Sequence, residues 1–324
     1  MDIPGRSAVV CFGEALALVP DAAAVDDPQA PAQAAGAEVN VALDLAAAGV
    51  TVAWVGRLGA DPHGDLVART LADAGVDTGG IGIDPDHPTG RYAKSPGPDG
   101  STVMTYRRAG SAASAADPEL LETPAVRDRI AVADWVHVGG ITAAVSTPCA
   151  ATLETLLAHP RRYRVSFDVN WREQMWPDGD PAPVVALAGR ADVVLVGADE
   201  AQRVFGTDDP ARLRALLPDP ELVVVKDGPR RALAVHRDGA VTERAALVVD
   251  VVEPVGAGDA FAAGLLTGLV RGEDVGRCLR RGHLGAAAVL VVPGDSAAPL
   301  PEHLLDLDDD AWAALRVTAD RWAG

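Results

Sequence analysis

Short runs of apolar residues recur along the chain, and they are separated by segments in which apolar positions fall three or four residues apart. The short runs are typical of buried strands, and the wider spacing is typical of one face of a helix. Strands that alternate with helices predict an α/β protein with a doubly wound, mainly parallel sheet. The runs that predict such strands are residues 8–12, 51–55, 135–138, 164–168, 192–196 and 222–226.

Two helices near the start of the chain are marked by their ends as well as by their apolar spacing. Apolar residues over 39–47 form a helical stripe that Gly49 closes. Asp61 followed by Pro62 is typical of a helix start, because Asp caps free N–H groups and Pro suits the first helical position. The segment 21–35, rich in Ala, Pro and Asp, is interpreted as a loop or an edge strand.

Two regions depart from the strand–helix alternation and predict antiparallel hairpins. Residues 90–94 and 102–107 flank a turn-forming segment, and they indicate a small β subdomain inserted in the α/β chain. Residues 232–236 and 241–245 predict a second hairpin at a sheet edge. For the tail, residues 312–322, we expect a helix.

The composition excludes several classes of protein. With 324 residues, 48% of them hydrophobic, the chain can bury a core as one large domain or two unequal ones. A net charge of −18 argues against a nucleic-acid partner, which requires a basic face. Three widely spaced cysteines indicate a reducing compartment and no metal cluster. Because the chain shows neither a signal-peptide pattern nor an apolar run of membrane-spanning length, we expect a soluble cytoplasmic protein with no membrane partner.

The most informative stretch is a small-residue turn late in the chain. An apolar run, 249–252, predicts a strand, and the turn Gly256-Ala257-Gly258 then leads into a helix. Because the backbone N–H groups of such a turn have no partner within the helix, they can bind an anion. Asp259 beside them either caps the helix or removes a proton from a hydroxyl that attacks a phosphoryl group. For this stretch alone the capping interpretation is preferred.

Two other phosphate-binding motifs do not fit the turn. No Lys-Ser or Lys-Thr pair follows the glycines, which excludes a Walker loop. The turn also lies late in the chain and lacks the third glycine of a dinucleotide-binding fingerprint.

An earlier glycine-containing stretch completes a pair of motifs. Gly36 allows the backbone to approach a ligand closely, and Asn40 offers a donor and an acceptor near a helix start. Alone, this stretch is typical of helix capping. Residues 254–259 resemble the second signature of the ribokinase-like (PfkB) sugar kinase family, and the interval between the two stretches also fits, so the resemblance covers nearly the whole chain. The residues that resemble the first signature are Gly36, Asn40-Val41-Ala42, Gly49 and Gly59.

Within that family the chain most resembles the 2-keto-3-deoxygluconate kinases. The resemblance implies one ribokinase-like kinase domain over residues 1–324, with a β-sheet lid formed by about 14–36 and 88–108. It also implies ATP and Mg²⁺ as the phosphoryl donor system and a sugar acid as the acceptor. The stretches that carry it are residues 36–40, 106–112, 139–142, 168–172 and 294–295.

Two arginines support an acidic acceptor. Arg108 follows a predicted hairpin strand, and Arg172 follows a predicted sheet strand at the edge where open α/β sheets bind ligands. A guanidinium group matches a carboxylate through two parallel hydrogen bonds. Each arginine has an alternative interpretation as a surface salt-bridge partner. With the family resemblance we assign both to the substrate carboxylate, and we assign the neighbouring Arg107 to the surface.

The resemblance also supplies the other acceptor contacts. Tyr92 and Tyr106 offer a ring face and a hydroxyl from the lid, although packing within the lid is an alternative role for Tyr92. The full set of acceptor-binding residues that we expect is Gly36, Asn40, Tyr92, Tyr106, Arg108, Ile141, Arg172 and Asp295.

For the nucleotide, the resemblance places phosphates near Lys226, Gly228 and Asn170, together with Gly256 and Gly258 of the turn. It places a magnesium-bound water near Glu200. Three positions depart from the family pattern. The first two bear on the binding of magnesium and ATP. The third argues against a monovalent-cation site that many members of the family form. They are Gly197 in place of Asn, Arg231 in place of Gly, and Glu253 in place of Asp.

We therefore expect an ATP-dependent kinase that phosphorylates 2-keto-3-deoxygluconate at its primary hydroxyl, with Asp259 as general base and the turn as anion hole. A kinase for a neutral acceptor, such as fructose, ribose or a nucleoside, is the alternative within the class. A non-catalytic sugar- or nucleotide-binding regulator on the same fold is the alternative from another class. Because a lid hairpin leaves strand edges that need covering, we expect a homodimer or a higher homo-oligomer through the lid.

Overall fold

The main sheet runs through the centre of the molecule. The computed structural model describes residues 8–97, 102–176, 178–294, 297–319 and 322–323. Within these residues the main sheet is mainly parallel, and its last two strands form an antiparallel hairpin at one edge, which confirms the predicted α/β class. In spatial order the strands are β13 (Val241–Ala245), β12 (Arg231–His236), β11 (Leu222–Asp227), β10 (Val193–Gly197), β9 (Arg164–Asp168), β8 (Trp135–Gly139), β1 (Val9–Phe12), β4 (Val52–Gly59) and β5 (Asp77–Asp84).

Both faces of this sheet are buried. In β1, Val9 and Cys11 belong to one apolar cluster, whereas Val10 and Phe12 belong to another. Successive side chains of a strand point to opposite faces, so a strand covered on both sides must be apolar throughout. This explains why the sequence shows continuous apolar runs rather than alternation.

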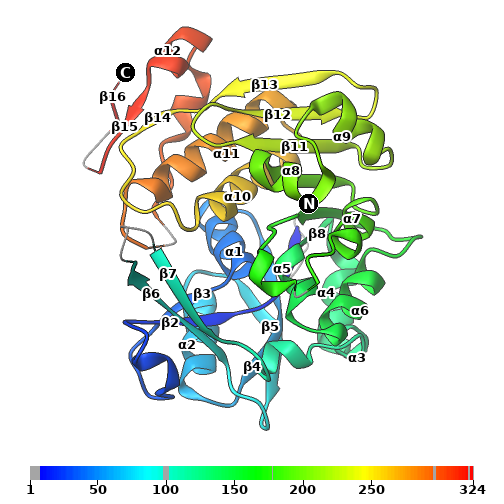
Figure 1. Ribbon diagram of the computed structural model, residues 1–324, viewed down its shortest axis with the longest axis vertical. Coiled ribbons are helices and arrows are strands. Elements are labelled where there is room, and N and C mark those ends of the chain that lie inside the picture. The colour runs from blue at the N-terminus through cyan, green and yellow to red at the C-terminus, as the bar shows by residue number, and fades with distance from the viewer. Residues whose placement is uncertain (1–7, 98–101, 177, 295–296, 320–321, 324) are drawn as a thin grey trace.

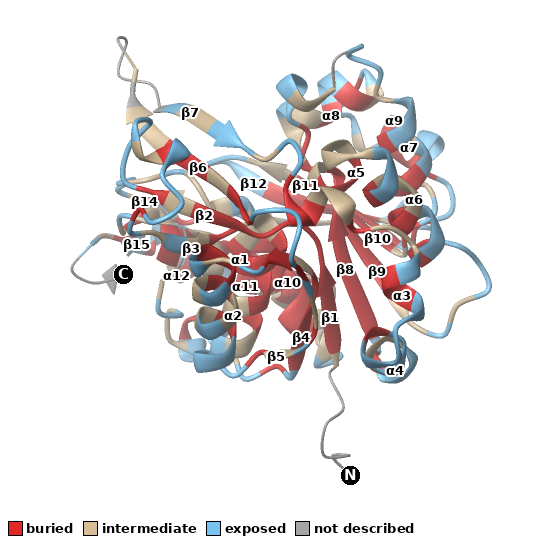
Figure 2. Cartoon of the chain, turned by 90° about the horizontal axis from the view of Figure 1, so that it is seen from below, coloured by how far each residue is buried: buried red, intermediate tan, exposed pale blue. Residues whose placement is uncertain are grey.

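Helices form the layer on each side of the sheet (Figure 2). One layer contains α1 (Ala37–Ala47), α2 (Pro62–Asp73), α10 (Ala257–Val270) and α11 (Val275–Leu290). The other contains α3 (Glu119–Glu122), α4 (Pro124–Val132), α5 (Gly140–Val145), α6 (Thr147–Leu156), α7 (Ala182–Ala188), α8 (Ala198–Phe205) and α9 (Pro210–Leu216).

A second, smaller sheet stands beside the main one (Figure 1). Its strands, in order, are β3 (Gln33–Ala35), β2 (Leu16–Val19), β6 (Gly90–Pro96) and β7 (Thr102–Arg107). One face packs Leu16, Ala35 and Tyr92 together, while Val103 and Tyr106 of β7 remain 46% and 40% exposed. The apolar pattern did not identify β2, although it lies in the segment 14–36 that the family resemblance assigns to the lid, and β3 is the edge strand that the segment 21–35 contains.

Two sequence predictions near the C-terminus are wrong. The apolar run 249–252 is not a strand; only β14 (Val248–Val249) is, because the N–H of Val252 leaves the ladder and donates to Leu290 O at the end of α11 (2.7 Å). The tail is helical only in α12 (Asp309–Ala314), which is followed by β15 (Arg316–Val317) and β16 (Trp322–Ala323). Leu315 and Val317 both pack into a cluster with Trp312, which is the two-residue period of a strand.

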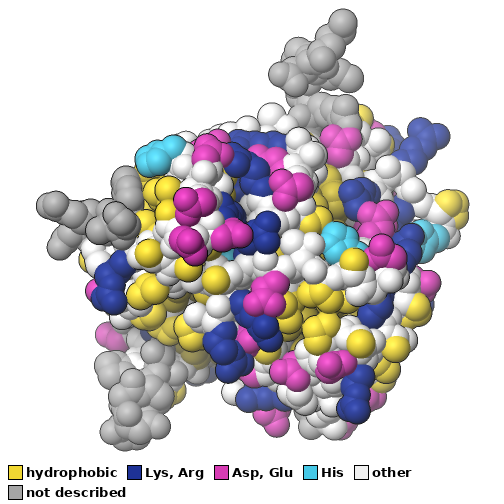
Figure 3. All heavy atoms as spheres, turned by 90° about the horizontal axis from the view of Figure 1, so that it is seen from above, with side chains coloured by type: hydrophobic (Ala, Val, Ile, Leu, Met, Phe, Trp, Pro, Cys, Tyr) yellow, Lys and Arg dark blue, Asp and Glu magenta, His cyan; other side chains and the backbone are white. Residues whose placement is uncertain are grey.

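Charged side chains of both signs are interspersed over the face shown in Figure 3. Close ion pairs join many charged residues of the chain, among them Arg277 with Asp306 (2.6 Å) and Arg280 with Asp309 (2.7 Å). In the part of the chain that the structure describes, no helix is both long and apolar enough to cross a bilayer.

Candidate active site

The glycine turn forms the N-terminus of α10. Gly256 has a φ of 87°, a left-handed value that favours glycine. The first helical hydrogen bond runs from the N–H of Ala260 to Gly256 O (2.9 Å). The N–H groups of Ala257, Gly258 and Asp259 therefore precede the helical ladder and have no carbonyl partner within it. Such a group of N–H donors at a helix N-terminus suits an anion.

Helix α11 fixes the position of this turn. Val252 and Glu253, just ahead of the turn, both donate their N–H groups to Leu290 O, at 2.7 and 3.3 Å. Within α10, a methyl group on Gly264 would lie 2.3 Å from the carbonyl oxygen of Arg281. The two helices therefore touch backbone to backbone, and a larger residue at position 264 would push α10 and its turn away.

The two sequence signatures meet at Asn40 and Asp259, which are 219 residues apart in the chain. Asn40 Nδ2 donates to Asp259 Oδ2 at 2.9 Å. Asn40 lies near the start of α1, which Gly36 precedes with a φ of 130°. A methyl group on Gly36 would lie 2.4 Å from Glu14 O, so this position requires glycine. The hydrogen bond orients the carboxylate of Asp259 from a second helix.

The pKa of Asp259 suits a general base. Burial raises it to about 7, and the charge of Asp168 adds to the rise. The hydrogen bond from Asn40 and the charges of Lys226 and Arg172 act in the opposite direction. A base with a pKa close to neutral is partly deprotonated at neutral pH, yet binds a proton well.

A lysine ammonium group lies beside the turn. Lys226 Nζ donates to Asp168 Oδ2 at 2.7 Å, which joins the carboxyl ends of β11 and β9. A methyl group on Gly258 would lie 3.6 Å from the same Nζ. Burial lowers the pKa of Lys226, but Asp168, Glu200 and Asp259 together raise it further, so the ammonium group stays charged. Asp168 was not assigned to the site from sequence, although its place at the end of a predicted strand is a usable signal.

Arg172 and Glu200 form an ion pair at the same edge of the sheet. Arg172 Nη1 donates to Glu200 Oε1 at 3.2 Å, and the arginine side chain is 51% exposed. The other oxygen of Glu200 accepts the N–H of Gly197 at 2.9 Å, at the start of α8. Because this contact uses a backbone N–H, the replacement of Asn by Gly at position 197 leaves it intact.

Two further nucleotide candidates lie directly beyond strand ends. Asn170, just past β9, is buried and has a φ of 39°. Gly228 has a φ of 51° in the turn between β11 and β12. Arg231, the departure at the start of β12, lies 3.6 Å from Asp227 and 3.0 Å from Glu243.

Two buried glutamates that were not assigned from sequence influence each other through their charges, and Glu38 also interacts with the charge of Asp259. Glu38 is 1% exposed, and Glu14 is 3% exposed. Burial raises the pKa of Glu38 to about 8, with further contributions from Asp259 and Glu14, and burial raises the pKa of Glu14 to about 7. Glu38 Oε1 accepts from Thr142 (3.2 Å), while Oε2 has no hydrogen-bond partner among the described residues. The position of Glu14, just beyond a buried strand, is the signal that could have found it.

Arg108 connects the second sheet to this acidic group. Its Nη2 lies 3.4 Å from Glu14 Oε2, and its guanidinium group lies over the ring of Tyr106 at 4.3 Å. Tyr106 stacks on Tyr92 of the neighbouring strand, with 5.5 Å between ring centroids. Tyr92 is 5% exposed, so packing accounts for most of its surface.

Ile141 and Asp295 complete the set of acceptor-binding candidates that the sequence predicted. Ile141 lies half-buried in α5, directly after β8. Asp295 lies outside the described residues. Arg107 pairs with exposed Asp26 at 2.6 Å, away from Arg108.

Glu253 contacts the second sheet. Its Oε2 lies 4.0 Å from Nζ of Lys94 in β6, and its Oε1 accepts the N–H of Val255 at 3.2 Å. The ammonium group of Lys94 therefore lies beside the carboxylate of Glu253, just ahead of the glycine turn.

Comparison with known proteins now gives the family. The model of the "pfkB family carbohydrate kinase" matches residues 6–303. The chain is 32% identical to 2-dehydro-3-deoxygalactonokinase of Haloferax volcanii, over 83% of this chain and 86% of the relative. It is 31% identical to 2-dehydro-3-deoxygluconokinase of Bacillus subtilis, over 81% and 82% of the two chains. It is also 32% identical to fructokinase-1 of Zea mays, over 82% and 84%.

Solved structures agree with this placement. A PfkB protein from Polaromonas sp. JS666 superposes with a TM-score of 0.77 at 30% identity, over 90% of this chain and 98% of the other. Fructokinase from Vibrio cholerae O395, solved with fructose, ADP and a calcium ion bound, gives a TM-score of 0.77 at 26% identity, over 91% and 96%. The chain therefore belongs to the pfkB family of carbohydrate kinases and is an ATP-dependent sugar kinase.

Proposed function

We propose that this kinase transfers the terminal phosphoryl group of ATP to the primary hydroxyl of 2-keto-3-deoxygluconate (2-dehydro-3-deoxygluconate), giving the 6-phosphate. The 2.9 Å hydrogen bond between Asn40 and Asp259, at the start of α10, is the observation that carries the catalytic assignment. The similarity to a deoxygluconokinase and a deoxygalactonokinase, together with Arg108 and Arg172, supports an acidic acceptor.

Asp259 is assigned as the general base. It accepts the proton of the acceptor hydroxyl while the hydroxyl oxygen bonds to the γ-phosphorus of ATP. The bond from that phosphorus to the bridging oxygen breaks, and ADP leaves. Asn40 keeps the accepting carboxylate oriented throughout.

The turn before Asp259 is assigned as the anion hole. Gly256, Ala257 and Gly258 present backbone N–H groups to the transferring phosphoryl group, and Lys226 adds a positive charge beside Gly258. One such preorganised donor is typically worth about 10²–10³ in rate.

We assign the ATP phosphates to Lys226, Gly228 and Asn170, and Mg²⁺ to the neighbourhood of Glu200. Among the described residues no group of three His, Cys, Asp or Glu side chains could hold a metal alone. This fits Mg²⁺, which commonly binds through one or two carboxylates and the substrate phosphates. Glu200 is already engaged by Gly197 and Arg172, so it suits a contact through water. When bound, the ion neutralises phosphate charge.

Arg108 is assigned to the carboxylate of the sugar acid, with Arg172 as the second cation. Glu14 is the neighbour that would compete for Arg108, but its pKa of about 7 means that it readily holds a proton. A protonated Glu14 leaves the guanidinium charge available to the substrate. We assign the hydroxyls of the acceptor to Gly36, Asn40 and Tyr106, with Ile141 and Tyr92 as apolar contacts.

The second sheet, β3-β2-β6-β7, is assigned as a lid that excludes water from the phosphoryl transfer. Its β7 lies at the edge of the sheet and exposes Val103 and Tyr106. We propose that a second copy of the chain covers this edge, giving a homodimer. Light scattering coupled to size exclusion would test this; a monomer at micromolar concentration would contradict it.

The activity is tested by measuring ADP production with a panel of acceptors: 2-keto-3-deoxygluconate, its galactose-series epimer, fructose, ribose and a nucleoside. We expect kcat/KM for one of the two sugar acids to exceed that for fructose by at least about tenfold, because a site built for a carboxylate leaves charged groups unpaired with a neutral sugar. Fructose is the second candidate, favoured by the similarity to fructokinase-1. A preference for fructose would sink the sugar-acid assignment, and no turnover with any acceptor would favour a regulator.

Arginine variants locate the carboxylate. Arg108→Ala and Arg172→Ala should each raise KM for the sugar acid by about tenfold or more, since charged hydrogen bonds are worth about 1.5–3 kcal/mol. Arg107→Ala is the matched control, because Arg107 pairs with exposed Asp26 instead. Equal changes in KM for the sugar acid and for fructose would contradict the assignment.

A further inference from the structure

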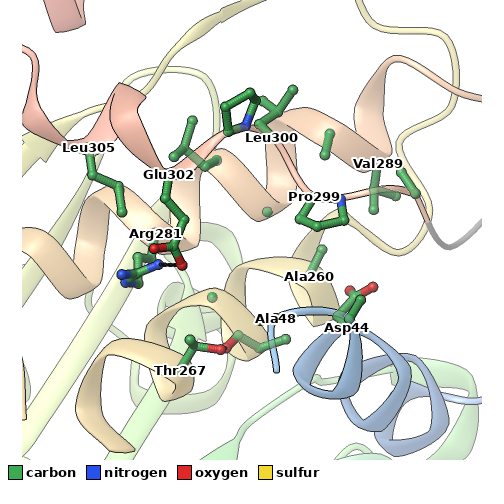
Figure 4. A pocket seen from close by; sticks show the side chains of 18 residues that line it. Asp44, Ala48, Ala260, Thr267, Arg281, Val289, Pro299, Leu300, Glu302 and Leu305 are labelled. Carbon is green, nitrogen blue, oxygen red and sulfur yellow. Dashed lines mark hydrogen bonds and ion pairs between the residues drawn. The ribbon is translucent and has the colours of Figure 1, made fainter. Parts of the chain in front are cut away.

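A cavity of about 350 Å³ lies between α1, α10 and α11, and it is also lined by Ala297, residues 299–302 and Leu305 (Figure 4). Among the described residues that line it, none belongs to the acceptor, nucleotide or metal assignments made above. Its walls are mostly small and apolar, and include Ala263, Leu284 and Pro299. A space of this size with apolar walls and few polar groups is typical of a small-molecule site.

One carboxylate gives the cavity its polarity. Asp44 projects from α1 towards the segment that carries Pro299 (Figure 4). Its Oδ2 is buried and has no hydrogen-bond partner among the described residues. Burial raises the pKa of Asp44 to about 7, and the charge of Asp259 adds to the rise. A buried carboxylate oxygen without a donor is costly unless a ligand supplies one.

The opposite end of the cavity has no charge to offer an anion. Arg281 Nη1 donates to Glu302 at 2.9 Å, and its Nε and Nη2 donate to Glu273 at 2.6 Å each. In Figure 4 a dashed line marks the contact between Arg281 and Glu302. The charge that remains to be matched is therefore negative and belongs to Asp44.

The cavity also touches both helices that position the catalytic base. Asp44 lies four residues after Asn40 on α1, and therefore on the same side of that helix. Ala260, which lines the cavity, directly follows Asp259 on α10. A molecule in the cavity would contact both helices, and with them the two ends of the hydrogen bond between Asn40 and Asp259.

We propose that this cavity is a second binding site, for a small amphipathic primary amine whose ammonium group pairs with Asp44 and whose apolar part lies among Ala263, Leu284 and Pro299. Its occupant changes the rate of phosphoryl transfer through α1 and α10. The binding step does not depend on which sugar the kinase accepts, so it is measured separately from the proposed function.

Binding is tested by calorimetry on the full-length protein with benzylammonium, and with benzyl alcohol as the uncharged analogue. Benzylammonium should bind at least about tenfold more tightly than benzyl alcohol, because the charged hydrogen bond is made only by the amine. Asp44→Asn should remove that advantage. Asp259→Asn, the control for binding in the acceptor site, should keep the preference for benzylammonium over benzyl alcohol. Equal binding of the amine to Asp44→Asn and to the unmodified chain would overturn the proposal.

A filled cavity tests the coupling. Ala47 lines the cavity but is exposed, so Ala47→Trp can occupy the space without disturbing the core. Saturating benzylammonium should change kcat by at least about threefold in the unmodified chain, and should leave kcat of Ala47→Trp unchanged. An unchanged kcat in the unmodified chain would contradict the coupling, and an equal change in both proteins would place the amine elsewhere.

Discussion

The proposed acceptor side and the proposed nucleotide side of the site hold their carboxylates in opposite ways. On the acceptor side, burial raises the pKa values of Glu14, Glu38 and Asp259 to about 7, about 8 and about 7. On the proposed nucleotide side, Asp168 faces Lys226, with 2.7 Å between the carboxylate oxygen and the ammonium nitrogen. Carboxyl groups that exchange a proton near neutral pH suit hydroxyl groups, whereas an ion pair such as that of Lys226 with Asp168 keeps a cation in place for phosphates.

The largest expected effect is on the acceptor side. Asp259→Asn should lower kcat by about 10²–10⁴, because the amide cannot accept the hydroxyl proton. Binding of ATP should change little, since the glycine turn and Lys226 remain. Rapid-quench measurement of product and calorimetry with a non-hydrolysable ATP analogue check both parts. The exposed Asp73→Asn is the control; near-normal turnover of Asp259→Asn would refute the base assignment.

On the proposed nucleotide side, breaking the ion pair between Lys226 and Asp168 should lower the stability of the folded protein. Lys226→Met leaves Asp168 without its cation, and loss of one partner of a buried pair typically destabilises by about 3–5 kcal/mol. The double variant Lys226→Met with Asp168→Asn removes the stranded charge and should recover part of that loss. Urea unfolding of the unmodified chain, of Lys226→Met and of the double variant gives the three free energies of unfolding to be compared. If the double variant were no more stable than Lys226→Met, the pair would not be what holds Asp168.

A pH profile sharpens the difference between the two sides. Since the proposed base works only when deprotonated, kcat at saturating sugar acid should rise with pH through a midpoint near 7, the pKa of Asp259. The hydrogen bond from Asn40 lowers that pKa, so Asn40→Ala should move the midpoint upward. At a pH below both midpoints an upward move of one unit corresponds to about a tenfold lower rate. A midpoint that stays in place would show that Asn40 does not tune the base.

The smallest expected effect concerns stability. A carboxyl whose pKa is raised by folding binds its proton more tightly in the folded chain. The contribution of Glu38 to the free energy of unfolding is therefore fully present below its ordinary pKa of 4.5, and it is lost as the pH rises towards about 8. Glu38→Gln, which cannot ionise, should melt close to the unmodified protein at about pH 5 and a few degrees above it at about pH 8.5. A constant difference in melting temperature across that range would contradict the raised pKa.

Much of the fold followed from local patterns. The strands of the main sheet are apolar throughout because both faces are buried, so they were visible as runs. The short strand β2 was not identified from the apolar pattern, since a run of four apolar residues fits a strand and a piece of buried helix equally well. The tail was misassigned because Leu315 and Val317 show a strand period only against the cluster that includes Trp312.

Some residues of the candidate site could also be identified from the sequence, and others could not. Asp259, Asn40 and the glycine turn were identified because their spacing forms two signatures. Glu14, Glu38 and Asp168 were not, because an acidic residue at a strand end or in the first turn of a helix is usually exposed, and the sequence does not show that these three are buried. Their roles depend on which strand ends share an edge of the sheet.

The sequence by itself determined the class of fold, the family and the residues of the two signatures, because these depend on local spacing and small residues. Only the tertiary structure decided the electrostatics. The rise in the pKa of Asp259 comes from burial and from Asp168, and the arginines that were assigned to a carboxylate already contact Glu14 and Glu200. Desolvation and charge proximity are properties of packing between distant segments, so no local pattern encodes them.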